Sequence, residues 1–343
     1  MLIGFCNYYS FYNNNRMFEP INSPIGDDLG YAFRRLKNIF EDHGHRVCTV
    51  DQASIEDFDA IVFLDFPTHG NRYFREALKL PRDRLYLVLF ENETIRPDNW
   101  LPANHAYFQK VFTWHSGLVD GKTYVRLNPA NNLAFDPSDF DVSSKNRFCV
   151  LIASQKYARH SNELYSHRLE AIRWFETNHP EQFDLYGIGW DRLLLEKAPF
   201  VVNAALSFAY RKAAWLPKYS SFPSYRGPVA SKREILRNYR FSICYENAMY
   251  PGYVTEKLFD CFLAGCVPVY WGAPDISELI PPDTFVDRAK FRSYESLYER
   301  LSQMGAVEHQ GYLDRIKAFL ASDSARPYGA DSFAETLLLE ATA

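Results

Sequence analysis

Residues 239–274 constrain the fold more than any other stretch, because they predict a strand, a loop, a helix and a second strand in succession. The apolar run Phe241–Tyr245 predicts the first strand, and Pro251 and Gly252 break the chain after it. The second strand is expected at 267–271. Between the strands, apolar residues in two adjacent pairs about one turn apart predict a helix buried on one face. These residues are Leu258, Phe259, Phe262 and Leu263.

The polar residues of this block gather where the first strand ends and the helix begins. In open α/β sheets, ligands bind outside the carboxyl ends of the strands, beside helix N termini that favour anions. We therefore expect a site for a phosphorylated ligand at this point. The candidate binding residues are Glu246, Asn247, Tyr253, Glu256 and Lys257.

The same block resembles the donor-binding motif of the α-1,3-fucosyltransferase family, glycosyltransferase family 10. That motif has an aromatic-Glu-Asn start, a Tyr-Val-Thr-Glu-Lys core and a closing Tyr-Trp-Gly-small-Pro. The three parts stand here in the same order, at 245–247, 253–257 and 270–274. The resemblance implies an α/β protein of the GT-B fold, in which two Rossmann-like domains face each other across a cleft.

The resemblance also implies an inverting glycosyltransferase that moves L-fucose from GDP-fucose to an acceptor hydroxyl. Family acceptors point to O3 of GlcNAc in an N-acetyllactosamine-type or O-antigen glycan. Two other functions fit the same residues. One is transfer of another GDP-linked sugar, and the other is binding of a carbohydrate or nucleotide by a catalytically idle protein. The retention of the motif's Tyr253, Glu256 and Lys257, together with Glu91, argues against the idle form.

Chain length and net charge narrow the classes of fold and of binding partner that remain. At 343 residues the chain can form two domains, and its net charge of -4 gives no basic field for nucleic acid. Strand patterns separated by helical ones recur along both halves and predict parallel sheets with helices on their faces. We expect an acceptor-binding domain at 1–145, a donor-binding domain at 146–325 and a C-terminal helix or tail at 326–343. The irregular stretch 199–228 supports no assignment.

Several strands and helices are expected in addition to those of the motif. The expected strands are 2–6, 46–50, 60–64, 85–90, 110–114, 148–153 and 183–186, and the expected helices are 28–43, 163–176, 231–238, 293–320 and 331–342.

The catalytic base is expected in Phe90-Glu91-Asn92-Glu93-Thr94, which follows the strand 85–90. A carboxylate placed there can accept the proton of an acceptor hydroxyl. Both Glu91 and Glu93 fit, since the first matches the Glu-Asn-Glu spelling of bacterial family members and the second the Glu-Ser-Pro spelling of animal ones. Glu91 is slightly favoured. His69 and His115 lie in loops of the same half and are candidates for acceptor contact.

Cationic side chains are expected to stabilise the departing diphosphate. Lys257 falls in the first turn of its helix, where a positive charge opposes the helix dipole and needs another reason to be present. The resemblance assigns it a pyrophosphate contact and assigns Arg168 to the donor site, with Lys232 as a weaker candidate. A guanidinium suits bidentate binding of phosphate. Arg159, Arg173 and His160 are rivals of Arg168.

No metal ion or other cofactor is expected. Asp57-Phe58-Asp59 and Asp139-Phe140-Asp141 match the Asp-x-Asp spelling of metal-dependent transferases, but both lie away from the motif. Two short matches in a chain with this many aspartates carry little weight.

Cysteine usage and hydropathy bear on location. The six cysteines form no Cys-x-x-Cys pair and are interpreted as reduced thiols. No segment reaches the roughly 18 consecutive apolar residues that span a bilayer. Animal members of the family carry an N-terminal anchor, so the sequence favours a bacterial-type soluble cytoplasmic protein, with peripheral contact at the inner face of the membrane left open.

Overall fold

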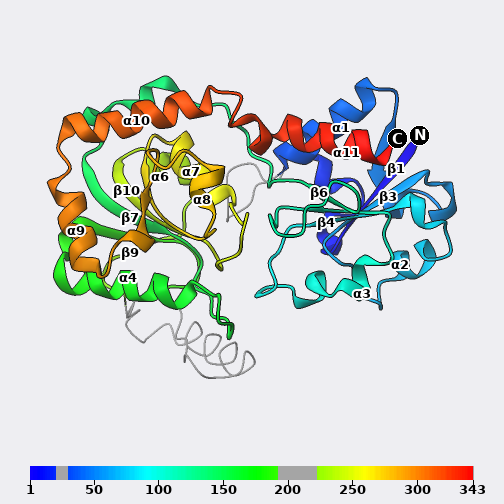
Figure 1. The fold of residues 1–343 in the computed structure, drawn as a ribbon, viewed down its shortest axis with the longest axis horizontal. Helices are drawn as coiled ribbons and strands as arrows, with labels where there is room; N and C mark the ends of the chain where they lie inside the picture. The colour runs from blue at the N-terminus through cyan, green and yellow to red at the C-terminus, as the bar shows by residue number, and fades with distance from the viewer. Residues whose placement is uncertain (21–29, 192–221, 343) are drawn as a thin grey trace, which may run out of the picture.

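The structure is a computed structural model that describes residues 1–20, 30–191 and 222–342. It contains two six-stranded parallel sheets, each with its own core, which form two lobes (Figure 1). The expectation of two Rossmann-like domains is confirmed. No helix among the described residues is both long enough and apolar enough to cross a membrane.

The sheet of the first lobe has the strand order β2-β1-β3-β4-β5-β6. Its strands are β1 (Leu2–Asn7), β2 (Arg46–Thr49), β3 (Ala60–Leu64), β4 (Leu85–Leu89), β5 (Lys110–Thr113) and β6 (Tyr124–Arg126). The helices of this half are α1 (Tyr31–Asp42), α2 (Arg72–Ala77) and α3 (Pro102–His105). Every residue of β3 and β4 is buried, as expected for central strands covered on both faces.

The sheet of the second lobe has the order β12-β11-β10-β7-β8-β9. Its strands are β7 (Arg147–Ile152), β8 (Phe183–Tyr186), β9 (Tyr225–Gly227), β10 (Tyr239–Tyr245), β11 (Val267–Trp271) and β12 (Val286–Asp287). The described helices of this half are α4 (Tyr165–Asn178), α6 (Lys232–Leu236), α7 (Glu256–Leu263), α8 (Ile276–Leu279), α9 (Tyr294–Gln303) and α10 (Ala306–Leu320). The motif thus forms the unit β10–α7–β11, with β10 and β11 paired in parallel.

Two sequence expectations need correction or qualification. The single helix expected over 293–320 is two helices, α9 and α10, because Met304 is extended and Arg240 donates a hydrogen bond to its carbonyl oxygen. The start of the helix expected at 28–43 lies outside the described residues, and so does most of 199–228; the described part of that helix is α1.

The C-terminal helix α11 (Ala330–Ala341) returns to the first lobe and lies beside α1, close to the N terminus (Figure 1). Phe333 and Leu337 enter the core that α1 and β1 share. Arg35 of α1 pairs with Asp331 at 2.5 Å, and Lys110 pairs with Glu340. The chain therefore crosses between the lobes twice, which ties their relative position at two places.

The lobes also touch where the carboxyl ends of their strands meet. The Ser116 hydroxyl, which follows β5, donates to Asp275 Oδ2 of the second lobe at 2.7 Å, and the Ser116 N–H donates to the Pro251 carbonyl oxygen at 3.2 Å. Within the second lobe the Gly252 N–H donates to Asp275 Oδ1 at 2.8 Å. A Cβ at Gly252 would overlap the carbonyl oxygen of Trp114, and the φ of Gly252 is +82°. Glycine at this position therefore permits the close approach of the two lobes.

Candidate active site

Glu246, directly after β10, anchors the start of α7. Its side chain is fully buried, and it accepts hydrogen bonds from the Thr255 N–H at 2.9 Å and the Thr255 hydroxyl at 2.7 Å. Lys257 Nζ lies 3.3 Å from Oε2 of the same Glu246 carboxylate. A Cβ on Gly272 would lie 2.5 Å from Glu246 Cγ, so the closing Gly of the motif makes room for this carboxylate. Both carboxylate oxygens are occupied, and we therefore assign Glu246 a positioning role.

Lys257 presents its ammonium at the edge of the same site. Nζ also contacts Thr255 Oγ1 at 2.9 Å and Glu256 Oε1 at 3.4 Å, and the side chain is 22% exposed. Burial would lower the pKa of Lys257, but Glu256 and Glu246 raise it well above its usual range. The ammonium is therefore charged, and it is available to an anion from the cleft.

Glu256 keeps an open carboxylate, with its side chain 47% exposed. Burial raises the pKa of Glu256, but Lys257 and Lys232 outweigh it and bring the pKa to about 2. An ionised carboxylate at this place can accept hydrogen bonds from two vicinal sugar hydroxyls.

Arg168 approaches the site from α4 and is almost fully buried. Its guanidinium donates to the carbonyl oxygen of Tyr245 at 3.2 and 2.6 Å and to Asn247 Oδ1 at 3.1 Å. Burial lowers the pKa of Arg168. Within the described ranges no carboxylate lies in ion-pair distance of this side chain, although the charge of Glu246 acts to raise its pKa. A guanidinium without a close carboxylate suits an anionic ligand.

Asn247 and Tyr253 complete this side of the site. Asn247 accepts from Arg168, and its Nδ2 lies 3.5 Å from the Tyr253 hydroxyl. Tyr253 is buried, with its ring centroid 4.6 Å from that of Trp114 in the other lobe. Asn247 therefore orients Arg168. Tyr253 joins the first lobe to the donor residues, the name used here for the candidate donor-binding side chains Arg168, Asn247, Tyr253, Glu256 and Lys257.

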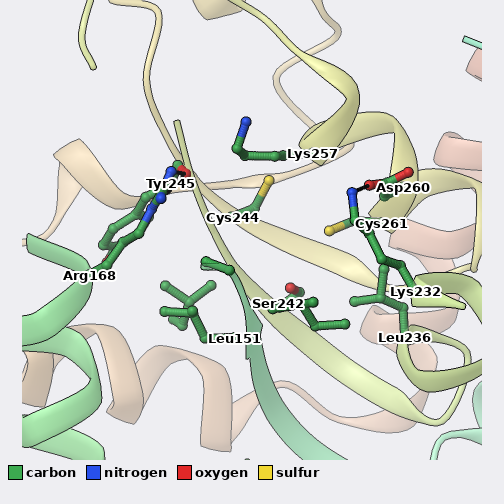
Figure 2. A pocket seen from close by; sticks show the side chains of 13 residues that line it. Leu151, Arg168, Lys232, Leu236, Ser242, Cys244, Tyr245, Lys257, Asp260 and Cys261 are labelled. Atoms are coloured by element: carbon green, nitrogen blue, oxygen red, sulfur yellow. Dashed lines mark hydrogen bonds and ion pairs between the residues drawn. The ribbon is translucent and has the colours of Figure 1, made fainter. Parts of the chain in front are cut away.

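Lys232 lies with Arg168 and Lys257 around one narrow pocket beside β10 (Figure 2). It pairs with Asp260 of α7 at 2.6 Å, a partner that the sequence did not indicate. Burial opposes the charge of Lys232, but Asp260 and Glu256 raise its pKa. Its ammonium thus lies closer to its carboxylate partner than that of Lys257, which is 3.3 and 3.4 Å from the carboxylates of Glu246 and Glu256.

The structure separates the two candidate bases. Glu91 is half-buried, and its backbone is held on both sides, because its N–H donates to Asp65 at 3.1 Å and its carbonyl accepts from Trp100 Nε1 at 3.0 Å. Glu93 is 48% exposed and contacts Tyr250 and His160 at 3.3 and 3.9 Å. Glu91 is therefore the more firmly placed of the two.

The charges around Glu91 come from both lobes. Burial raises the pKa of Glu91, and Asp65 and Glu256 raise it further, while Lys156 and Lys257 lower it. Lys257 and Glu256 belong to the second lobe, and the neighbouring Glu93 contacts Tyr250 of that lobe at 3.3 Å, so this segment faces the second lobe. A carboxylate with a raised pKa in such a place suits a general base.

The other candidates lie elsewhere. Arg173 pairs with Glu176, and Arg159 has no described contact with the pocket residues. His69 packs against the rings of Phe66 and Tyr107, whereas His115 packs against Trp100 and Trp114, and burial lowers the pKa of His115. None of these side chains joins the donor residues.

The Asp-x-Asp triplets have structural contacts. Asp59 accepts the Leu2 N–H at 2.7 Å, and the buried Asp139 pairs with Arg233 at 2.7 Å and with Arg237 at 3.1 Å. Among the residues that the structure describes, no group of three His, Cys, Asp or Glu side chains could hold a metal ion.

The two parallel six-stranded sheets, each with its own helices, define the GT-B fold. A solved α1,3-fucosyltransferase with GDP has this fold, with a TM-score of 0.54, 14% identity and coverage of 99% of this chain and 90% of that one. A family model described as glycosyltransferase family 10 (fucosyltransferase) C-term matches residues 219–314. The second lobe therefore carries the C-terminal domain of glycosyltransferase family 10, as the motif predicted.

Curated relatives agree with this family. The α-(1,3)-fucosyltransferase FucT of Helicobacter pylori is 32% identical over 88 residues, 26% of this chain and 18% of that protein. The GDP-fucose protein O-fucosyltransferase 3 of Danio rerio is 46% identical over 272 residues, 76% of this chain and 50% of that protein. The chain thus spans half or less of the length of both relatives.

Proposed function

We propose that this protein transfers L-fucose from GDP-fucose to an acceptor hydroxyl with inversion at the anomeric carbon. The observation that carries the proposal is that Arg168 and Lys257 line one pocket of the second lobe, while the segment of Glu91 and Glu93 meets that lobe, with Tyr250 3.3 Å from Glu93. The names of the relatives and the solved complex with GDP support the choice of donor.

Each group has a role in a single displacement. Glu91 takes the proton of the acceptor hydroxyl, whose oxygen attacks the anomeric carbon of fucose. The bond from that carbon to the diphosphate breaks, and its electron pair leaves with GDP. Lys257 and Arg168 stabilise the negative charge that develops on the diphosphate. Glu256 binds vicinal hydroxyls of the ribose or the fucose. Because side-chain cations supply the positive charge, the proposal calls for no metal ion.

For the acceptor we propose O3 of GlcNAc in an N-acetyllactosamine-type or O-antigen glycan. A second candidate is a protein hydroxyl, because a relative that is aligned with 76% of this chain is named as a protein O-fucosyltransferase. For location we propose the cytoplasm, since all six cysteines are free thiols.

A transfer assay tests the proposal. The protein is incubated with GDP-fucose and either N-acetyllactosamine or a panel of folded protein modules, with EDTA present in one arm. We expect release of GDP and an α-linked fucose on one acceptor class, equally with and without EDTA. Transfer from GDP-mannose alone would instead support a different GDP-sugar, and retention of the donor's β configuration would contradict a single displacement.

A further inference from the structure

Tyr165, the first residue of α4, carries a buried hydroxyl that has no hydrogen-bond partner among the described residues. The residue is 6% exposed. A phenolic hydroxyl can donate one hydrogen bond, and leaving it unpaired in the interior is destabilising. Such a group calls for an explanation, and a ligand that occupies the site is one.

Two other buried tyrosines of the second lobe do have partners. The Tyr239 hydroxyl donates to Asp184 at 2.7 Å, and the Tyr270 hydroxyl donates to the carbonyl oxygen of Tyr253 at 3.2 Å. The Tyr245 hydroxyl, like that of Tyr165, has no partner among the described residues, so the missing partner is shared by these two tyrosines and not by every tyrosine of this lobe.

The surroundings of Tyr165 belong to the candidate active site. The Arg168 guanidinium carbon lies 5.1 Å from the centroid of its ring. Burial raises the pKa of Tyr165 to about 12, although Arg168 and Lys257 act to lower it, and Glu91 raises it further. The hydroxyl is thus protonated at neutral pH, and the charges of Arg168, Lys257 and Glu91 all act on it.

We propose that Tyr165 is a further ligand of the donor substrate, and that its hydroxyl donates a hydrogen bond to a phosphate oxygen of the bound nucleoside diphosphate sugar. This inference rests on the proposed function. An anion held between Arg168 and Lys257 would bring an acceptor atom to the one donor of Tyr165 that the protein leaves unused. It would also join the two cations as a third, neutral contact to the leaving group.

Tyr165→Phe removes only the hydroxyl and separates binding from stability. Calorimetric titration with GDP should show a Kd about 10- to 100-fold higher than that of the wild type, as for a lost hydrogen bond to a charged group. Inorganic pyrophosphate should lose affinity by a similar factor, whereas guanosine, which has no phosphate, should bind as before. The Tm of the ligand-free variant should be unchanged or higher, because an unpaired buried polar group has gone.

Tyr239→Phe is the matched control, since Tyr239 lies at the amino end of β10, the end opposite to the candidate site, and its hydroxyl is paired. It should lower the Tm and leave the Kd for GDP unchanged. A wild-type Kd for GDP in Tyr165→Phe, or a loss confined to guanosine, would overturn the inference alone. A lower Tm with unchanged binding would assign Tyr165 a structural role. Failure of the wild type to bind GDP or GDP-fucose would overturn the proposed function, and the inference with it.

Discussion

The carboxylate of Asp65 accepts a hydrogen bond from the backbone N–H of Glu91 at 3.1 Å, and a second from that of Phe90 at 2.8 Å. Asp65 directly follows β3 and has a φ of +61°, and Asn99 Nδ2 donates a third hydrogen bond to it at 2.6 Å. Burial raises the pKa of Asp65, while these three donors favour its charged form. One strand end thus fixes the backbone of the proposed base on the next strand.

Asp65→Asn should move the acid limb of the pH profile of kcat/KM to lower pH. The base must be ionised to act, and the negative charge of Asp65 is one cause of the raised pKa of Glu91. Its removal lowers that pKa, so Glu91 stays ionised to lower pH. Asparagine tolerates a positive φ and can still accept the backbone hydrogen bonds, so the fold should persist.

Asp59→Asn is the control, because Asp59 precedes the same strand and accepts a backbone N–H at its opposite end. The acid limb of the kcat/KM profile of Asp59→Asn should match that of the wild type. An unmoved limb in Asp65→Asn would mean that a group other than Glu91 sets the profile.

Glu91→Gln should lower kcat by about 100- to 10,000-fold, the usual contribution of a general base, with little change in the Kd for GDP. Glu93→Gln should stay within about tenfold of the wild type, because its exposed carboxylate contacts Tyr250 and His160 and not the donor residues. Initial rates of GDP release with saturating acceptor measure both. A larger loss of kcat in Glu93→Gln than in Glu91→Gln would assign the base to Glu93.

Lys257→Met should weaken GDP binding and also lower the free energy of unfolding by about 3 kcal/mol, because it leaves the carboxylate of Glu246 buried without its cation. Adding Glu246→Gln should restore part of the stability and none of the affinity. Urea unfolding and calorimetry on the two single variants and the double variant measure both effects. If the double variant were as unstable as Lys257→Met, the ion pair would not be the cause.

His309 of α10 makes stability depend on pH. Its side chain is fully buried and Nε2 lies 3.0 Å from the Arg240 carbonyl oxygen, and burial lowers the pKa of His309 from 6.5 to about 4. Above pH 6.5 the ring is neutral in both states, so its stabilising effect is complete. As the pH falls toward 4, only the unfolded chain binds the proton, and stability should drop by about 3 kcal/mol.

His309→Gln lacks the titrating ring and should lose this part of the pH dependence. Urea unfolding at pH 7 and pH 4.5 compares the variant with the wild type. Equal losses of stability in both proteins would show that other groups are responsible.

Much of the fold was predictable because long, strongly patterned segments dominate it. The central strands β3, β4 and β11 are continuous apolar runs and β10 is mostly apolar, and the motif determines how β10 and β11 connect. The edge strands β6, β9 and β12 were missed, since two or three residues are too few to show a period. The docking of α11 on the first lobe depends on contacts with α1, which are remote in sequence.

The residues of the candidate site were likewise predictable only in part. The motif and its family resemblance supplied Lys257, Glu256 and Arg168, because these residues stand at recognisable positions. Asp65 and Tyr165 were not predicted, since their importance arises from partners, or from the lack of one, across the fold. The position of Asp65 directly after a buried strand was the one available signal. Glu246 was predicted as a ligand, and only its contacts with Thr255 and Lys257 indicate a positioning role.

Calorimetric titration of the wild type and of Lys257→Met with GDP-fucose, GDP-mannose and UDP-galactose tests the central claim most directly. We predict that the wild type prefers GDP-fucose and that the variant loses most of this affinity at a temperature where it is still folded. Equal or tighter binding of UDP-galactose, or no binding of GDP-fucose, would contradict the claim that the second lobe is a GDP-fucose site.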